Sequence, residues 1–179
     1  MDSAGSAFVL QTVYGRISPA QRDEVCALWI EERALPPAEA ERRAAEVLFL
    51  IRDAVSGDLA GVSTIYRERL PPGTDRYWFL RMFVRRESRG LSGLVSLPPR
   101  VLEAAFAHLA EPPRTDPDCR GVAVVAENAK LRSPLVLEHW LLDLPGWRLT
   151  GHDAGGRPII RRDFDPLPAA GVMPAAERP

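Results

Sequence analysis

Three β-rich segments follow one another between residues 47 and 84, and this succession limits the fold more than any other feature of the chain. The segments are Val47–Asp53, Leu59–Leu70 and Arg76–Val84, and short turns containing Gly, Pro, Ser or Asp separate them. Turns of this length join neighbouring antiparallel strands. The sequence therefore predicts an antiparallel meander at the centre of the chain.

The residues before the meander predict one strand and two helices. Ala7–Gly15 is β-rich and alternates in polarity, as a strand does. The pair Ser18-Pro19 then supplies an N-cap and a first-turn proline for an amphipathic helix, which Pro36-Pro37 ends. A short helix rich in Ala, Glu and Arg comes next.

The residues after the meander predict a crossover and a closing hairpin. A helical pattern stops at Pro112-Pro113, and Cys119–Asn128 is then an almost continuous apolar run, typical of a strand buried on both faces. Ser133-Pro134 opens another helix, and a hairpin turns around Asp153–Gly156. The whole order predicts an α/β mixed sheet, antiparallel in its first half, with a central crossover helix.

Composition narrows the class of protein. The chain has 179 residues and a formal net charge of −1, which suggests one domain and gives no reason to expect a nucleic-acid or membrane partner. Cys26 and Cys119 are far apart and lack metal-ligand spacing, so we expect buried, reduced thiols, no metal and a cytoplasmic location. The N-terminus does not resemble a signal peptide. We expect a domain at residues 1–164 and a disordered Pro- and Ala-rich tail at 165–179.

A loop rich in Arg, Gly and Ser follows the third meander strand, with the sequence RRESRGLSGLVSLPPR at residues 85–100. The N–H groups of a glycine-containing loop and of the helix after it can converge on a pyrophosphate. Arg85, Arg86 and Arg89 would add attraction for phosphate groups. The alternative interpretation is a solvated basic turn.

The order of elements and this loop together resemble the GNAT superfamily of N-acetyltransferases. The residues that carry the resemblance are Val84, Glu87, Arg89, Gly90 and Leu97 in and around the loop, Asn128 after the next strand, and the pair Gly146-Trp147. The resemblance covers roughly Phe8 to Phe164. It implies a sheet whose middle strands splay apart to admit acetyl-coenzyme A (acetyl-CoA).

The resemblance also implies which residues would bind this cofactor. The main chain of Phe83 and Val84 would face the pantetheine arm, the amides of the loop would face the phosphates, and Asn128 would lie near the far end. The complete predicted set is Phe83, Val84, Arg89, Gly90, Leu91, Ser92, Gly93 and Asn128. Ser92 and Leu94 stand where the family has glycines, and Pro98-Pro99 predicts that the helix begins near Ser96 or Leu97.

The catalytic residues of many GNAT enzymes have no counterpart here. Leu142 stands where many members have a tyrosine acid, and the strand RYWFLRMFV has Arg81 as its only interior charge, not a glutamate base. Glu127 is either a base or a strand-end carboxylate paired with an arginine. His139 and Asp143 are either a tuned pair or a surface pair. The catalytic residues therefore stay unassigned.

The leading hypothesis is an acetyl-CoA-dependent N-acyltransferase that acts on a small-molecule or protein amine, with a homodimer as a further expectation. The alternative is a catalytically inactive GNAT-like binding or regulatory domain, which the missing acid and base favour. A weaker resemblance to acyl-homoserine-lactone synthases rests on Arg81, and Phe79 replaces the acidic residue of those proteins.

Overall fold

The computed structural model describes residues 7–70, 73–90, 97–127, 129 and 133–165. The elements are β1 (Phe8–Thr12), α1 (Pro19–Glu31), α2 (Pro37–Ala44), β2 (Val47–Asp53), β3 (Leu59–Arg69), β4 (Arg76–Val84), the 3₁₀ helix η1 (Arg86–Gly90), α3 (Leu97–Ala110), β5 (Cys119–Val125), α4 (Pro134–Leu142), β6 (Arg148–His152) and β7 (Pro158–Asp163). The predicted order of strands and α-helices is confirmed.

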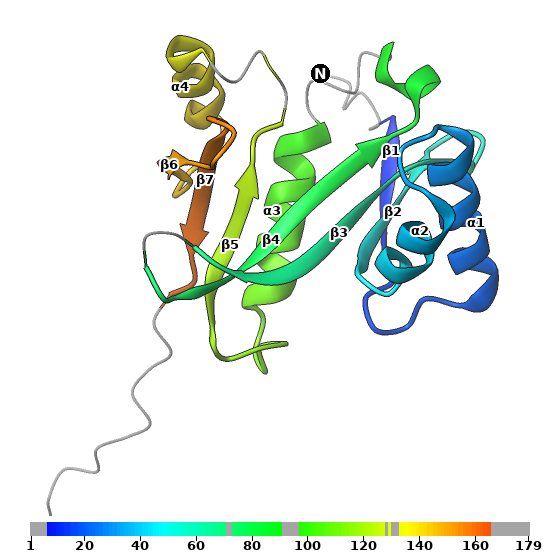
Figure 1. Ribbon diagram of the computed structural model, residues 1–179, viewed down its shortest axis with the longest axis horizontal. Helices are drawn as coiled ribbons and strands as arrows, with labels where there is room; N and C mark the ends of the chain where they lie inside the picture. The colour runs from blue at the N-terminus through cyan, green and yellow to red at the C-terminus, as the bar shows by residue number, and fades with distance from the viewer. Residues whose placement is uncertain (1–6, 71–72, 91–96, 128, 130–132, 166–179) are drawn as a thin grey trace, which may run out of the picture.

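The strands form one mixed sheet in the order β1-β2-β3-β4-β5-β7-β6. All neighbouring pairs are antiparallel except β4 and β5, which are parallel and joined by α3. The antiparallel first half and the central crossover helix are therefore as predicted. Figure 1 shows α3 lying behind β4 and β5, with α1 and α2 in front of the other end of the sheet.

The helices begin where local chemistry allows. The Ser18 hydroxyl accepts from Gln21 N–H at 3.2 Å, and the Gln21 side chain accepts from Ser18 N–H at 2.9 Å, which completes a capping box for α1. Pro134 is the first residue of α4. α3 begins at Leu97, so Pro98 and Pro99 fall in its first turn, where proline is tolerated.

Three strands end earlier than predicted, and β3 ends at Arg69 rather than Leu70. β1 ends at Thr12 rather than Gly15, because the chain turns after Val13 and Gly15 adopts a φ of 69°. β5 ends at Val125 rather than Asn128, and its pairing with β7 ends at the same residue. Asn128 lies outside the described residues, as do residues 166–179 of the predicted tail.

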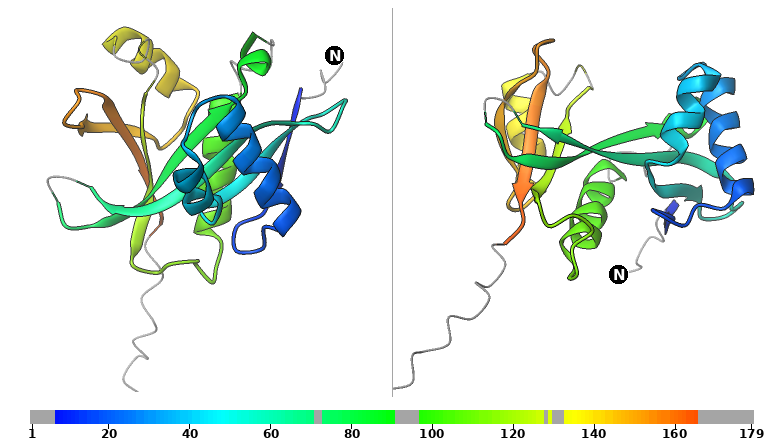
Figure 2. Two further views of the ribbon diagram at one scale, coloured as in Figure 1. Left: turned by 45° about the vertical axis from the view of Figure 1, so that its right-hand side comes forward. Right: turned by 60° about the horizontal axis from the view of Figure 1, so that its bottom comes forward.

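The sheet has helices on both faces (Figure 2). The largest apolar core lies beneath α3 and α4, and a second core lies beneath α1 and α2. A third apolar cluster contains no helical residue. Its members are Tyr66, Leu70, Tyr77, Phe79, Ala123, Val125 and Ile159, and we call it the strand-face cluster. None of the described helices covers this part of the sheet.

Cys26 and Cys119 are both free and buried, as predicted. Burial raises the pKa of the Cys119 thiol to about 11 and also raises the pKa of Cys26. Both thiols are therefore protonated at neutral pH and poorly nucleophilic. None of the described helices is long and apolar enough to span a membrane.

An ion pair joins Arg67 on β3 to Asp116 in the loop before β5. Arg67 Nη1 donates to Asp116 Oδ2 at 2.7 Å, and Asp118 N–H donates to the other carboxylate oxygen at 2.9 Å. The hydrogen bond from Arg67, supported by the one from Asp118, lowers the pKa of Asp116 despite its burial.

We expect Asp116→Asn to lower the free energy of unfolding by about 1 kcal/mol at neutral pH, because a buried charged acceptor is lost. The folded-state pKa of Asp116 lies below its unfolded value. This stabilisation is therefore present above the ordinary aspartate pKa of about 3.9 and is lost as the pH falls through the folded-state pKa. Urea denaturation at neutral and acid pH measures the difference.

The exposed pair of Asp75 and Arg120 provides the control. Asp75→Asn should change the free energy of unfolding by less than about 0.5 kcal/mol. If the difference between the wild type and Asp116→Asn did not narrow in acid, the ion pair would not be the source of the stabilisation.

Candidate active site

The strands β4 and β5 separate at their carboxyl ends. Their pairing ends at Leu80 and Val124, although β4 continues to Val84. Figure 1 shows the two strands diverging beyond this point. The splayed middle strands predicted from the sequence are therefore present, and carboxyl-end openings of this kind commonly hold ligands in α/β sheets.

The main chain of β4 presents polar groups to this opening. Arg85 N–H donates to the carbonyl of Ala60 on β3 at 2.7 Å. Because hydrogen-bonding direction alternates along an antiparallel pair, the main chain of Phe83 faces β3, whereas that of Met82 and Val84 faces the β5 side. Of the two strand residues predicted to contact the cofactor, Val84 thus presents its main chain to the opening.

Arg89 folds back onto the end of β4. Its Nε donates to the Val84 carbonyl at 2.8 Å, and its guanidinium lies 5.4 Å from the centre of the Phe83 ring. The residue as a whole is exposed. One N–H of the guanidinium is therefore used within the chain, and no described residue binds the terminal nitrogens.

Arg85 and Arg86 point elsewhere. Arg85 lies 3.6 Å from Glu31 and 3.7 Å from Glu87, and it lines an acidic hollow of about 380 Å³ beside the β2–β3 turn. Arg86 lines a second hollow with Glu31, Glu32 and Arg33. These two residues support the interpretation of this stretch as a solvated basic turn.

The first turn of α3 lies at the same end of the sheet as the opening, because α3 connects β4 to the parallel strand β5. A helix N-terminus favours an anion. Pro98 and Pro99 carry no N–H, however, so this turn offers fewer donors than an ordinary first turn. A pyrophosphate here would depend on the loop before α3. The predicted ligands Leu91, Ser92 and Gly93 belong to that loop and lie outside the described residues.

The strand-face cluster borders the opening on the sheet face where α1 and α2 lie. The rings of Tyr66 and Phe79 are 5.5 Å apart, and Arg81 stacks over Tyr66 at 3.7 Å. The Tyr77 hydroxyl donates to Asp163 at 2.9 Å, and burial is the main cause that raises its pKa. Tyr66 and Tyr77 therefore lie on the same face of the sheet.

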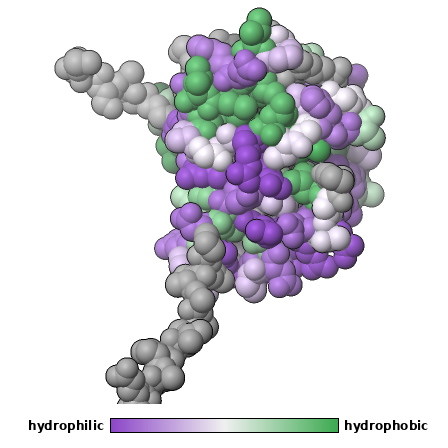
Figure 3. Space-filling model, turned by 90° about the vertical axis from the view of Figure 1, so that its left-hand side faces the viewer, coloured by the Kyte–Doolittle hydropathy of each residue, from purple (hydrophilic) through white to green (hydrophobic). Residues whose placement is uncertain are grey.

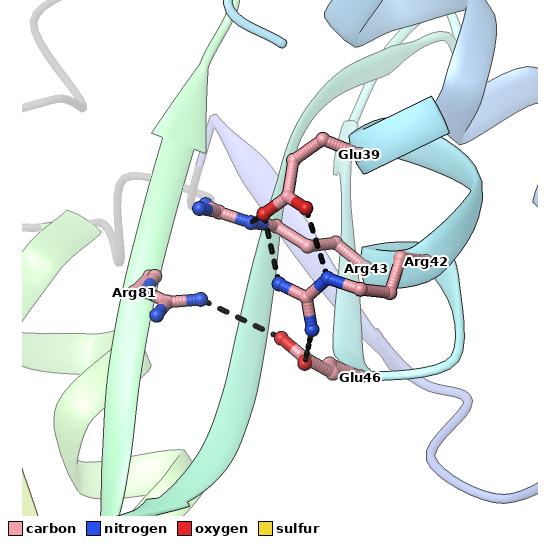
Figure 4. A network of polar contacts seen from close by, with 5 residues as sticks. All are labelled: Glu39, Arg42, Arg43, Glu46 and Arg81. Atoms are coloured by element: carbon pink, nitrogen blue, oxygen red, sulfur yellow. Dashed lines mark hydrogen bonds and ion pairs between the residues drawn. The ribbon is translucent and has the colours of Figure 1, made fainter. Parts of the chain in front are cut away.

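A network of charged residues lies between α2 and Arg81 (Figure 4). Arg42 donates two hydrogen bonds of 2.8 Å to Glu39 and one of 2.9 Å to Glu46, and Arg43 Nε also donates to Glu39. The hydrogen bond from Arg42, followed in size of effect by the one from Arg43, lowers the pKa of Glu39 to about 2. Three guanidinium groups thus face two carboxylates, which leaves a positive charge in excess.

The other candidate catalytic residues lie on the surface. Glu127 pairs with Arg157 at 3.4 Å and is exposed, which is the ion-pair alternative stated above. His139 and Asp143 are both exposed, and no hydrogen bond or ion pair joins them in the described part of the chain. Leu142 is 79% exposed. It shares α4 with the exposed apolar residues Leu135 and Val136, and Figure 3 shows an apolar area on this side of the molecule.

Comparisons with known proteins give similarity of fold only. No protein-family model matches the sequence, and no curated protein matches it. Similar solved structures include a protein from Bordetella pertussis assigned to the GnaT acetyltransferase family, with 17% identity over 87% of this chain and 95% of that one and a TM-score of 0.56.

Two further solved structures have a similar fold. A protein assigned as a phosphinothricin N-acetyltransferase has 13% identity over 89% of this chain and 99% of that one, with a TM-score of 0.53. A spermidine N-acetyltransferase chimera from Vibrio cholerae and hSSAT has 14% identity over 88% and 96%, with a TM-score of 0.53. The fold predicted from the sequence is confirmed, and the chain has the fold of the GNAT acetyltransferases.

Proposed function

We propose that the chain is an N-acyltransferase that takes an acetyl group from acetyl-CoA and transfers it to an amine. The observation that carries this proposal is the divergence of β4 from β5, with the main chain of Val84 and the start of α3 at the opening. The fold similarity to acetyltransferase structures supports it.

The residues of the opening fit such a cofactor. When bound, acetyl-CoA supplies an activated thioester carbonyl. The edge of β4 at Met82 and Val84 would bind the amide groups of the pantetheine arm, and the terminal nitrogens of Arg89 would bind a phosphate. In the reaction a neutral amine forms a C–N bond with the acetyl carbon as the C–S bond breaks, the amine loses a proton, and the sulfur gains one.

Calorimetry tests the proposal directly. We expect acetyl-CoA to bind the wild-type chain, and we expect Arg89→Ala to weaken binding about tenfold because a charged hydrogen bond to phosphate is lost. Arg86→Ala, which removes the same charge from the same turn, should change the affinity less than about twofold because its side chain lines a separate hollow. No heat and no thermal shift at millimolar acetyl-CoA would exclude the function.

The second candidate function is a GNAT-like domain that binds the cofactor without catalysis. The exposed position of Leu142 and the pairing of Glu127 with Arg157 favour it. Acetyl-CoA binding without acetylation of any amine in a broad panel would support this candidate, whereas clear turnover with one amine would remove it. The homodimer and the cytoplasmic location remain predictions.

A further inference from the structure

Arg81 occupies a special position on β4. It is the first residue beyond the last paired position, Leu80, so it stands where β4 leaves β5. It pairs in register with Thr64 of β3, and Phe79 pairs with Tyr66, so Arg81 shares a face with the strand-face cluster. No described helix covers that cluster. A molecule that approaches the opening from this face would therefore meet the guanidinium of Arg81.

The charge of Arg81 is only weakly compensated. Its nearest carboxylate, Glu46, lies at 3.5 Å, and the same carboxylate accepts a shorter bond of 2.9 Å from Arg42. The Arg81 side chain is 33% exposed, and its guanidinium stacks on Tyr66. A guanidinium that is partly desolvated and held against a ring has N–H groups free to bind a carboxylate or a phosphonate through two hydrogen bonds.

Arg43 adds to this positive site. Figure 4 shows the side chain of Arg43 extending from α2 towards β4. Its Nε is bound to Glu39, and no described residue binds its terminal nitrogens. Arg161, farther along the same face, lies 5.2 Å from the Tyr77 ring, and its Nε is 3.4 Å from Asp163, so its charge is already paired.

We infer that the acceptor amine carries an anionic group, a carboxylate or phosphonate, that Arg81 binds. This inference rests on the proposed function and specifies its acceptor. The carboxylate that lies next to Arg81, that of Glu46, is already bound by Arg42. A polycation such as spermidine would have to displace Arg42, whereas an anionic amine would give Arg81 a closer partner.

The experiment compares acceptors that differ only in charge. The panel contains the common amino acids, the matching amino-acid amides, aminomethylphosphonate and spermidine, each with acetyl-CoA as donor. We expect amino acids to exceed their amides in kcat/KM by about tenfold or more, a difference that a charged hydrogen bond supplies. The amine of an amino-acid amide is less basic than that of the amino acid, so more of it is in the neutral, reactive form. Amine ionisation alone would therefore favour the amide, and it cannot account for a preference for the amino acid. A preference for aminomethylphosphonate would identify the anion as phosphonate.

Variants assign the preference to Arg81. Arg81→Ala should raise KM for the anionic acceptor about tenfold with little change for the matching amide, and Arg81→Lys should recover part of the loss. Glu46→Gln should lower KM for the anion, because it removes a competing carboxylate. The control is Arg120→Ala, which removes a charge from an exposed pair with Asp75 and should leave all acceptors unchanged.

A binding measurement separates the failure of this inference from the failure of the proposed function. Calorimetry with the N-acetylated amino acids and their amides requires no turnover. The acids should bind the wild type more tightly than the amides do, and this difference should be absent in Arg81→Ala. If acetyl-CoA binds but amides or spermidine equal the acids in both assays, the inference about the acceptor is wrong and the function stands. If acetyl-CoA does not bind, the function itself is wrong.

Discussion

Replacing Trp147 with alanine should lower the free energy of unfolding by about 3–5 kcal/mol. The indole is 6% exposed and meets the ring of Phe106 edge-on at 6.4 Å. Its N–H donates to Glu103 Oε1 at 2.8 Å, and Arg162 donates to the other oxygen of the same carboxylate at 2.9 Å. The alanine variant would therefore leave a cavity and remove one partner of Glu103.

Two further variants show where this energy originates. Trp147→Phe keeps a large ring but loses the N–H, so it should cost less than the alanine variant. Leu142→Ala removes an exposed apolar side chain and should change the free energy of unfolding by less than about 0.5 kcal/mol. Urea denaturation at one pH compares all three, and a cost below about 1 kcal/mol for Trp147→Ala would show that the ring contributes little to the core.

The position of Trp147 illustrates what the sequence could predict. The pair Gly146-Trp147 is visible in the sequence as part of the resemblance to the GNAT superfamily, and Gly146 has a φ of 82°, which favours glycine. The partner Glu103 lies 44 residues away on α3. Local signals such as caps, prolines and polarity patterns fix where elements begin, but they do not specify which side chain of a distant element will accept a hydrogen bond.

The candidate site also combines features that the sequence predicts with features that it does not. The order of strands and helices predicted the crossover and hence the opening beside Val84. The arrangement of Arg81, Tyr66 and Glu46 depends on the register of β3 with β4 and on the packing of α2. The sequence marked Arg81 as an unusual charge inside an apolar strand, and that is the signal that could have identified this part of the site.

The arginines of the loop were harder to interpret from the sequence. Arg85, Arg86 and Arg89 are close together in the chain, yet only Arg89 turns towards the end of β4. Arg85 pairs with Glu31 on α1, and no local signal in the sequence placed these two residues together. Arginines that are close in the sequence are therefore not all close in space, because the turn of η1 directs successive side chains to different sides.

Replacing Gly121 with alanine should lower the free energy of unfolding by about 3 kcal/mol, because β5 and β7 approach too closely for a side chain there. A Cβ on Gly121 would lie 2.1 Å from the carbonyl oxygen of Arg162 and 2.8 Å from the Cα of Asp163. Both contacts are with the main chain, which cannot move without disrupting the pairing of the two strands. Relief of the clash would also displace Asp163, which holds the hydroxyl of Tyr77.

Gly73 is the matched control for this substitution. A Cβ there would lie 3.5 Å from the Leu70 carbonyl oxygen and 4.0 Å from the Asp75 nitrogen, both ordinary contacts, and the φ of Gly73 is not in the left-handed region. Gly73→Ala should therefore leave the free energy of unfolding unchanged or raise it by about a few tenths of a kcal/mol. The gain would arise because alanine has less conformational freedom than glycine in the unfolded chain. Thermal and urea denaturation of both variants measure the contrast. Equal stability of Gly121→Ala and Gly73→Ala would mean that β5 and β7 tolerate a wider separation, and the geometry of the strand-face cluster would then not depend on this close approach.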